Sequence, residues 1–168
     1  SALQAWLKEQ GHPAFRSKQL LQWIYQRGVV SFDQMSDLSK SLRDELERQF
    51  YIDSLPILAQ QEDPKDGTVK YLFALSDGEG VESVLMPQYS DSVKTHPQTG
   101  AIQDRKSLKI EGYTTCLTTQ VGCMFACRFC ASGQMGFKRN MTAGEIVAQV
   151  MAFQRAGKPV SRIVFMGT

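Results

Sequence analysis

Apolar side chains recur three and four positions apart through the first fifty residues, which is the spacing of helices that bury one face. Gly and Pro residues interrupt this pattern and mark the ends of the helices. A short helix can be capped by Ser31 or Asp33, and Ser39 can cap the helix that follows. The longer predicted helices are residues 2–10, 15–28 and 39–50. We therefore expect an N-terminal helical accessory domain, residues 1–54, with a core of its own.

The pattern changes after Leu55 to short apolar segments separated by turn signals. Residues 64–67 and 76–80 are rich in Asp, Gly, Pro and Ser, which favour tight turns. The predicted strands are residues 56–61, 68–75 and 81–86, with a short further strand at 108–110. We expect a small antiparallel β region, residues 55–112, that includes a mobile polar loop at 88–100.

From residue 113 onward the predicted order is strand, loop, helix and strand. Residues 114–121 are rich in Thr and Val, and residues 162–166 form a continuous apolar run suited to a buried parallel strand. Between them, Thr142 and Glu145 form a capping box that opens a helix. This order is a βαβ unit, and parallel sheets place their chemistry at the carboxyl ends of their strands.

The predicted fold class is therefore an α+β N-terminal part followed by the first βαβ unit of an α/β barrel. The N-terminal part combines the helical module with the small antiparallel sheet, and residues 113–168 begin the barrel. One βαβ unit cannot close a barrel. We therefore expect the barrel to be truncated and the chain to be a fragment of a longer protein.

Composition favours a soluble globular protein in a reducing compartment. The chain has 168 residues, 42% of them hydrophobic and 21% charged. It has no secretion signal and no apolar run near the roughly 20 residues that would span a bilayer. All four cysteines lie between positions 116 and 130, too close together for a disulfide framework. We therefore expect a cytoplasmic protein that does not enter a membrane.

The net charge of +2 is too small to indicate nucleic-acid binding by itself. Its distribution is uneven, since residues 101–140 carry six basic and two acidic side chains. The basic residues there are Arg105, Lys106, Lys109, Arg128, Lys138 and Arg139. This local excess can face phosphates or can be an ordinary solvated surface.

Three cysteines carry the clearest chemical signal in the chain. Cys123, Cys127 and Cys130 have C-x3-C-x2-C spacing, and thiolates in such a loop can hold several corners of one iron–sulfur cluster. Three protein ligands on a four-iron cluster leave one iron open to bind a substrate or cofactor. The alternative is a structural zinc site with Cys116 as a fourth ligand, although zinc sites usually pair their cysteines.

Three blocks of sequence resemble the RlmN/Cfr family of radical S-adenosylmethionine (SAM) RNA methyltransferases, and most closely its RlmN branch. These blocks are residues 15–25 with 35–43, residues 66–71 with 81–87, and residues 116–140. The third block is the most specific, because radical SAM families differ outside their three cysteines. Residues 88–112 form a longer stretch than the resemblance leads us to expect.

The resemblance implies roles for five residues. Cys123, Cys127 and Cys130 would bind a 4Fe–4S cluster that cleaves SAM reductively to a 5′-deoxyadenosyl radical. Glu82 would be the proton acceptor, a role that a carboxylate can fill as a general base. Cys116 would form a transient disulfide with a methyl-carrying cysteine, or else be a buried small side chain on its strand.

The implied function is methylation of adenine C2 in 23S rRNA and tRNA through a methyl-cysteine intermediate. Alternatives are a Cfr-like adenine C8 methyltransferase and a non-catalytic, zinc-stabilised RNA-binding module. The resemblance also implies a monomer that receives electrons from a donor such as flavodoxin. The methyl-carrying cysteine and most contacts to SAM would follow Thr168, so we expect these residues alone to be inactive.

Overall fold

The computed structural model describes residues 2–90 and 109–167. The chain divides into two compact units, which we call the helical unit, Ser1–Ser54, and the sheet unit, Leu55–Thr168. In the described part of the chain, no helix combines the length and the apolar character needed to cross a membrane.

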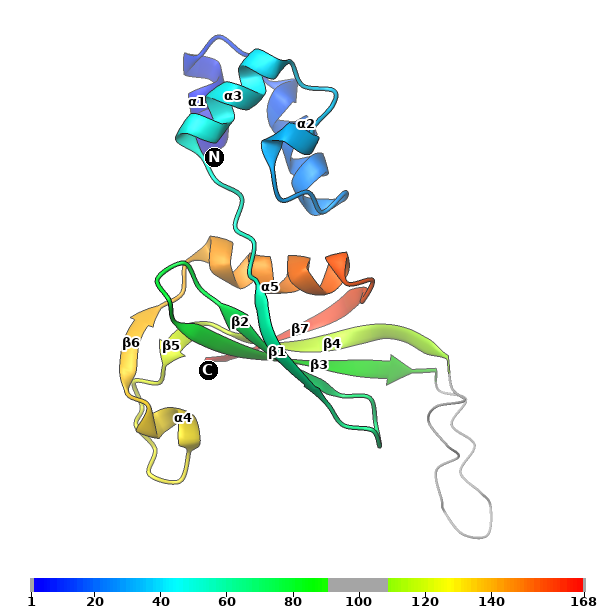
Figure 1. Ribbon diagram of the computed structural model, residues 1–168, viewed down its shortest axis with the longest axis vertical. Helices are drawn as coiled ribbons and strands as arrows, with labels where there is room; N and C mark the ends of the chain where they lie inside the picture. The colour runs from blue at the N-terminus through cyan, green and yellow to red at the C-terminus, as the bar shows by residue number, and fades with distance from the viewer. Residues whose placement is uncertain (1, 91–108, 168) are drawn as a thin grey trace. The chain divides into compact units, whose positions relative to one another are not determined.

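The helical unit contains three α-helices and one short 3-10 helix (Figure 1). These are α1 Ala2–Glu9, α2 Phe15–Tyr25, η1 Phe32–Gln34 and α3 Lys40–Gln49. Ser31 and Gln34 form a reciprocal capping box at η1, and the Ser39 hydroxyl accepts the Leu42 N–H at the start of α3. Side-chain oxygens therefore satisfy the first N–H groups of both helices, as the sequence predicts.

The helical unit has its own hydrophobic core. Its buried members come from every helix and from the connections between them: Leu7, Leu20, Val29, Phe32, Met35, Leu38, Leu42 and Leu46. Leu42 and Leu46 lie one turn apart on α3, so one stripe of that helix supplies two fully buried side chains.

A five-stranded sheet dominates the sheet unit, with strand order β1-β2-β3-β4-β7. The strands are β1 Ile57–Glu62, β2 Val69–Ala74, β3 Gly80–Tyr89, β4 Ile110–Thr118 and β7 Val160–Gly167. The first four pair antiparallel and β7 joins β4 in parallel. The sequence analysis separates residues 55–112 from 113–168, whereas β3 and β4 pair directly and join both regions into one sheet. Most of the predicted loop at 88–100 lies outside the described residues, because the described part of β3 and its flank ends at residue 90.

A second, two-stranded sheet was not predicted. It pairs β5 Gln120–Gly122 with β6 Phe137–Asn140, and the short helix α4 Ala131–Gln134 lies between them in sequence. The two strands approach so closely that a Cβ on Gly122 would lie 1.7 Å from the Gly136 carbonyl oxygen. Gly122 also has a φ of +72°, so glycine is required there for both space and backbone conformation.

Helix α5, Ala143–Arg155, covers one face of the five-stranded sheet (Figure 1). Thr142 and Glu145 form the predicted capping box at its start. Phe153 is fully buried and meets Tyr71 and Phe73 of β2 edge-to-face, with ring centroids 5.1 and 5.7 Å apart. This packing leaves the opposite face of the sheet for other contacts.

Candidate functional site

Side-chain alternation divides the sheet into a core face and a cavity face. Val81, Ser83 and Leu85 of β3 are buried, while the positions between them are open. Because successive side chains of a strand point to opposite faces, Glu82 and Val84 lie on the face away from the core that α5 covers. A cavity of about 600 Å³ lies along that second face.

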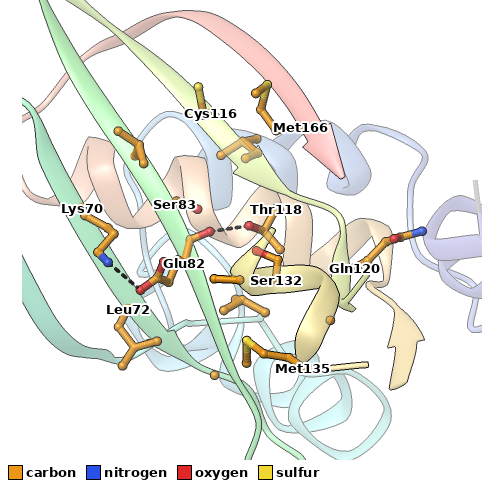
Figure 2. Close-up of a pocket in the computed structure, with 16 residues that line it drawn as sticks. Lys70, Leu72, Glu82, Ser83, Cys116, Thr118, Gln120, Ser132, Met135 and Met166 are labelled. Atoms are coloured by element: carbon orange, nitrogen blue, oxygen red, sulfur yellow. Dashed lines mark hydrogen bonds and ion pairs between the residues drawn. The ribbon is translucent and has the colours of Figure 1, made fainter. Parts of the chain in front are cut away.

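Glu82, the predicted proton acceptor, lines this cavity (Figure 2). Its side chain is 55% exposed, and its Oε1 atom lies 3.0 Å from Nζ of Lys70 on β2. Sequence reasoning did not single out Lys70. The signal that could have found it is the alternation of β2, since Lys70 and Leu72 face the cavity two residues apart and Leu72 lies opposite Glu82.

Cys116, the predicted disulfide partner, lines the same cavity from β4. It is partly buried and lies directly opposite Val84 in the pairing of β3 with β4. Glu82 is therefore its diagonal neighbour, and such neighbours in an antiparallel pair are about 7–8 Å apart. The structure brings together two residues that lie 34 positions apart in the sequence.

The cysteine loop, residues 123–130, connects β5 to α4. The Cys123 N–H donates to the Gly136 carbonyl at 3.1 Å, and the Cys130 N–H donates to the Cys127 carbonyl at the same distance. A Cβ on Gly133 would lie 2.8 Å from the main-chain N and O atoms of Cys127, so α4 packs tightly against the loop. These contacts define the backbone of the loop. Ser132 of α4 and Met135, which follows α4, both line the cavity (Figure 2).

All four cysteines lie in the described part of the chain as partly buried free thiols. Main-chain N–H groups of Gly133, and then of Ser132, donate to the Cys130 sulfur and lower the pKa of its thiol. Hydrogen bonds of this kind favour the thiolate, which is the form that binds metal.

The three thiols of the cysteine loop are donors of the kind that iron–sulfur clusters use, each thiolate binding a different iron. A structural zinc would instead need four ligands within about 2.3 Å of one ion. Within residues 2–90 and 109–167, no three Cys, His, Asp or Glu side chains are arranged to hold one ion.

Acidic partners balance part of the predicted positive surface. Lys138 pairs with Glu79 at 2.5 Å, and Arg139 pairs with Asp77 at 2.6 Å and with Glu145 at 2.8 Å. The hydrogen bonds to Glu145 and Asp77 raise the pKa of Arg139. Counting charge within residues 101–140 misses these partners, because all three acids lie outside that window.

The sequence of the chain is similar to those of known proteins. Residues 1–52 match the family described as "Ribosomal RNA large subunit methyltransferase N-terminal domain". Over 170 aligned residues, the chain is 44% identical to the probable dual-specificity RNA methyltransferases RlmN of Halalkalibacterium halodurans and Bacillus cereus. Each alignment covers 98% of this chain and 41% of the relative, so the chain spans about two fifths of the length of these proteins.

A solved structure agrees with the sequence relatives. The crystal structure of a radical SAM methyltransferase from Sphaerobacter thermophilus superposes with a TM-score of 0.74 and 35% sequence identity. The match covers 96% of this chain and 42% of that protein. Sequence and fold therefore agree over almost the whole chain, which matches the N-terminal portion of RlmN-family RNA methyltransferases and of a radical SAM methyltransferase.

Proposed function

We propose that the protein carrying this chain methylates C2 of adenine in 23S rRNA and tRNA through a methyl-cysteine intermediate. The observation that carries the proposal is a single cavity that is lined by Glu82, by Cys116 and by α4, the helix that follows the cysteine loop. Because the chain spans about two fifths of its relatives, the activity is proposed for the complete protein. Residues 1–168 by themselves are proposed to be inactive.

The proposed roles of the regions follow their order along the chain. Residues 1–54 are proposed to be an accessory domain, and residues 113–168 to begin a radical SAM barrel whose first strand, β4, pairs with the β region at 55–112 in one sheet. The parallel pairing of β4 with β7 around α5 supports the last of these, because such βαβ units build α/β barrels. The complete protein is proposed to be a cytoplasmic monomer that takes electrons from a donor such as flavodoxin.

Cys123, Cys127 and Cys130 are proposed to hold a 4Fe–4S cluster. When bound, this group and SAM supply a 5′-deoxyadenosyl radical, which is needed because adenine C2–H offers neither an acidic proton nor a nucleophilic carbon. The folded cysteine loop and the N–H groups that favour the Cys130 thiolate support this assignment.

Glu82 is proposed to accept the ring proton when the protein–RNA adduct is resolved. Its carboxylate lies on the cavity wall with Oε1 3.0 Å from Nζ of Lys70, and a carboxylate can take up a proton as a general base. Cys116 is proposed to form a disulfide with the methyl-carrying cysteine, which frees the methylated base. A base in a duplex cannot reach such a cavity, so the substrate adenine has to be unstacked first.

The cluster assignment is tested by anaerobic reconstitution of the chain with iron and sulfide. We expect a brown protein with about four iron atoms per chain. Cys127→Ala should lose the iron, whereas Cys116→Ala should keep it. A colourless protein that retains one tightly bound zinc, or loss of iron from the Cys116→Ala variant, would overturn the assignment of three ligands.

Product analysis of the complete protein tests the reaction itself. With SAM, a reductant and an RNA substrate, we expect 2-methyladenine as the main product. Accumulation of 8-methyladenine instead would contradict the proposal and favour the C8 reaction. Absence of any methylated base from a protein loaded with its cluster would favour a binding module.

A further inference from the structure

A buried amide lies beneath the strands that carry the candidate site. Gln149 of α5 is completely buried, within the core that also contains Ala148, Ala152 and Phe153. Burying an amide in an apolar core is costly unless its polar atoms find partners. The hydrogen-bond partners of the Gln149 side chain all lie outside helix α5, and two of them belong to β3 and β4.

Both ends of the Gln149 amide bind the main chain of Thr118. Its Nε2 donates to the Thr118 carbonyl at 2.9 Å, and its Oε1 accepts the Thr118 N–H at 3.3 Å. Oε1 also accepts a hydrogen bond from the Ser83 hydroxyl on β3. The Gln149 amide therefore makes the main-chain hydrogen bonds that a neighbouring strand would make at the end of β4. Through the Ser83 hydroxyl it also connects β3 to this point.

This arrangement matters because the ladder between β3 and β4 stops beside the site. The paired register runs from Tyr89 opposite Ile110 to Val84 opposite Cys116, so Glu82 and Ser83 lie past its end. Beyond that end, the Thr118 hydroxyl donates to the Glu82 carbonyl (Figure 2). Side chains therefore connect β3 to β4 at the point where Glu82 lies past the end of the ladder between these two strands.

We propose that Gln149 is a positioning residue: it holds the ends of β3 and β4 together, so that Glu82 and Cys116 remain on one wall of the cavity. The inference rests on the proposed roles of Glu82 and Cys116, but the geometry that it predicts can be tested without them. A residue that only fills the core would stabilise the whole sheet evenly. A positioning residue protects the strand ends more than the paired ladder.

Hydrogen exchange in the 168-residue chain separates these two outcomes. Gln149→Leu keeps the approximate volume but leaves the Thr118 main chain and the Ser83 hydroxyl without this partner. We expect amide exchange at residues 82–84 and 116–118 to rise about tenfold, equivalent to about 1.4 kcal/mol, as for loss of a buried hydrogen-bond partner. Residues 85, 86 and 113–115 on the paired ladder should change less than about twofold.

A second pair of variants keeps the test decisive if Gln149→Leu does not fold. Ser83→Ala removes only the hydroxyl that donates to Oε1 of Gln149, and it should raise exchange at residues 82–84. Ser83→Thr retains a hydroxyl and should restore protection. The matched control is Gln154→Leu, an exposed position on the same helix, which should leave exchange unchanged. An equal rise at all of these amides, or no rise at the strand ends, would overturn the proposal.

Activity of the complete protein provides the second readout. Gln149→Leu should lower kcat at least tenfold while KM for RNA changes less than about twofold, because positioning acts on the reacting groups and not on RNA binding. If the wild-type complete protein methylates no RNA, the proposed function fails while the exchange experiment still decides the role of Gln149. Unchanged kcat in a protein with loosened strand ends would contradict the positioning role.

Discussion

The ion pair between Lys70 and Glu82 is open to solvent on both sides, with side chains 49% and 55% exposed. Exposed pairs of this kind contribute about 0–1 kcal/mol to stability, because solvent screens the attraction and two long side chains must be held in place. The importance of Lys70 therefore lies in the charge that it places beside Glu82 on the cavity wall.

Lys70→Glu tests this view by placing two carboxylates together. We expect the free energy of unfolding to fall by no more than about 1 kcal/mol. Methylation by the complete protein should fall by at least roughly tenfold, and at most by the roughly 10²–10⁴-fold that a positioned acid–base group contributes. Chemical denaturation and single-turnover assays measure the two effects. Lys65→Glu, an exposed position in the β1–β2 turn, is the matched control, and equal activity in the two variants would rule out a role for Lys70.

Individual residues differ in how well sequence alone predicts them. The cysteine spacing is local, so Cys123, Cys127 and Cys130 can be identified as candidate ligands without a structure. The pairing of Glu82 with Lys70 depends on the register of two strands, and no local pattern specifies it. The same is true of Gln149, whose buried amide is intelligible only once its distant partners are known.

The start of helix α5 brings together a cap and an ion pair. Glu145 accepts the Thr142 N–H at 2.8 Å in the capping box and also pairs with Arg139 of β6. The hydrogen bonds from the Arg139 guanidinium have the largest effect and lower the pKa of the Glu145 carboxyl below its ordinary value of 4.5. Burial opposes this shift, and the contacts with Thr142 add to it. One carboxylate thus links α5 to the strand that follows the cysteine loop.

This linkage predicts how stability depends on pH. Because its folded-state pKa is lowered, ionised Glu145 contributes stability that is fully present above pH 4.5 and is lost as pH falls through the folded value. Glu145→Gln should cost about 1 kcal/mol at pH 7, since the neutral side chain can still cap the helix but pairs weakly with Arg139. Between pH 7 and pH 3, the variant should then lose less stability than the wild type.

Denaturant unfolding at several pH values measures this difference. Glu47→Gln is the control, because Glu47 is exposed on α3 of the helical unit. If the wild type and Glu145→Gln lose stability in parallel as the pH falls, the ionised Glu145 does not contribute in the way proposed.

At the scale of elements, segments with a periodic pattern or a capping residue were predictable, and segments with neither were not. Helix α5 has a capping box and thirteen residues, and it is confirmed with its predicted start. Strand β6 has four residues and a single apolar one, Phe137, so it shows no alternation to detect. It forms because Gly122 and Gly136 let β5 approach, which is a tertiary condition.

Two separate hydrophobic cores underlie the whole molecule. One belongs to the helical unit and the other to the sheet unit, and they share no residue. Helical periodicity and caps made the first core foreseeable. The continuity of the five-stranded sheet was not, since β3 and β4 are joined through a segment whose length and polarity suggested a boundary.

Separate cores predict separate responses to core mutations. Both tryptophans, Trp6 and Trp23, lie in the helical unit, so their fluorescence reports its unfolding alone. Leu46→Ala should destabilise this unit by about 2–5 kcal/mol and shift the fluorescence transition. Phe153→Ala should cost the sheet unit about 3–5 kcal/mol, seen by hydrogen exchange in β2–β4, and leave the fluorescence transition in place. A common shift of both signals in either variant would show that the units unfold together.

Strand β3 also limits how the length of this region can vary. Its odd-numbered side chains, such as Val81 and Leu85, fill the core, while Glu82 and Val84 face the cavity. A single inserted residue ahead of them would exchange the two faces, placing a carboxylate in the core and an aliphatic side chain at the site. Two inserted residues would restore the original parity. Natural or engineered length changes in β3 are therefore tolerated only in even numbers.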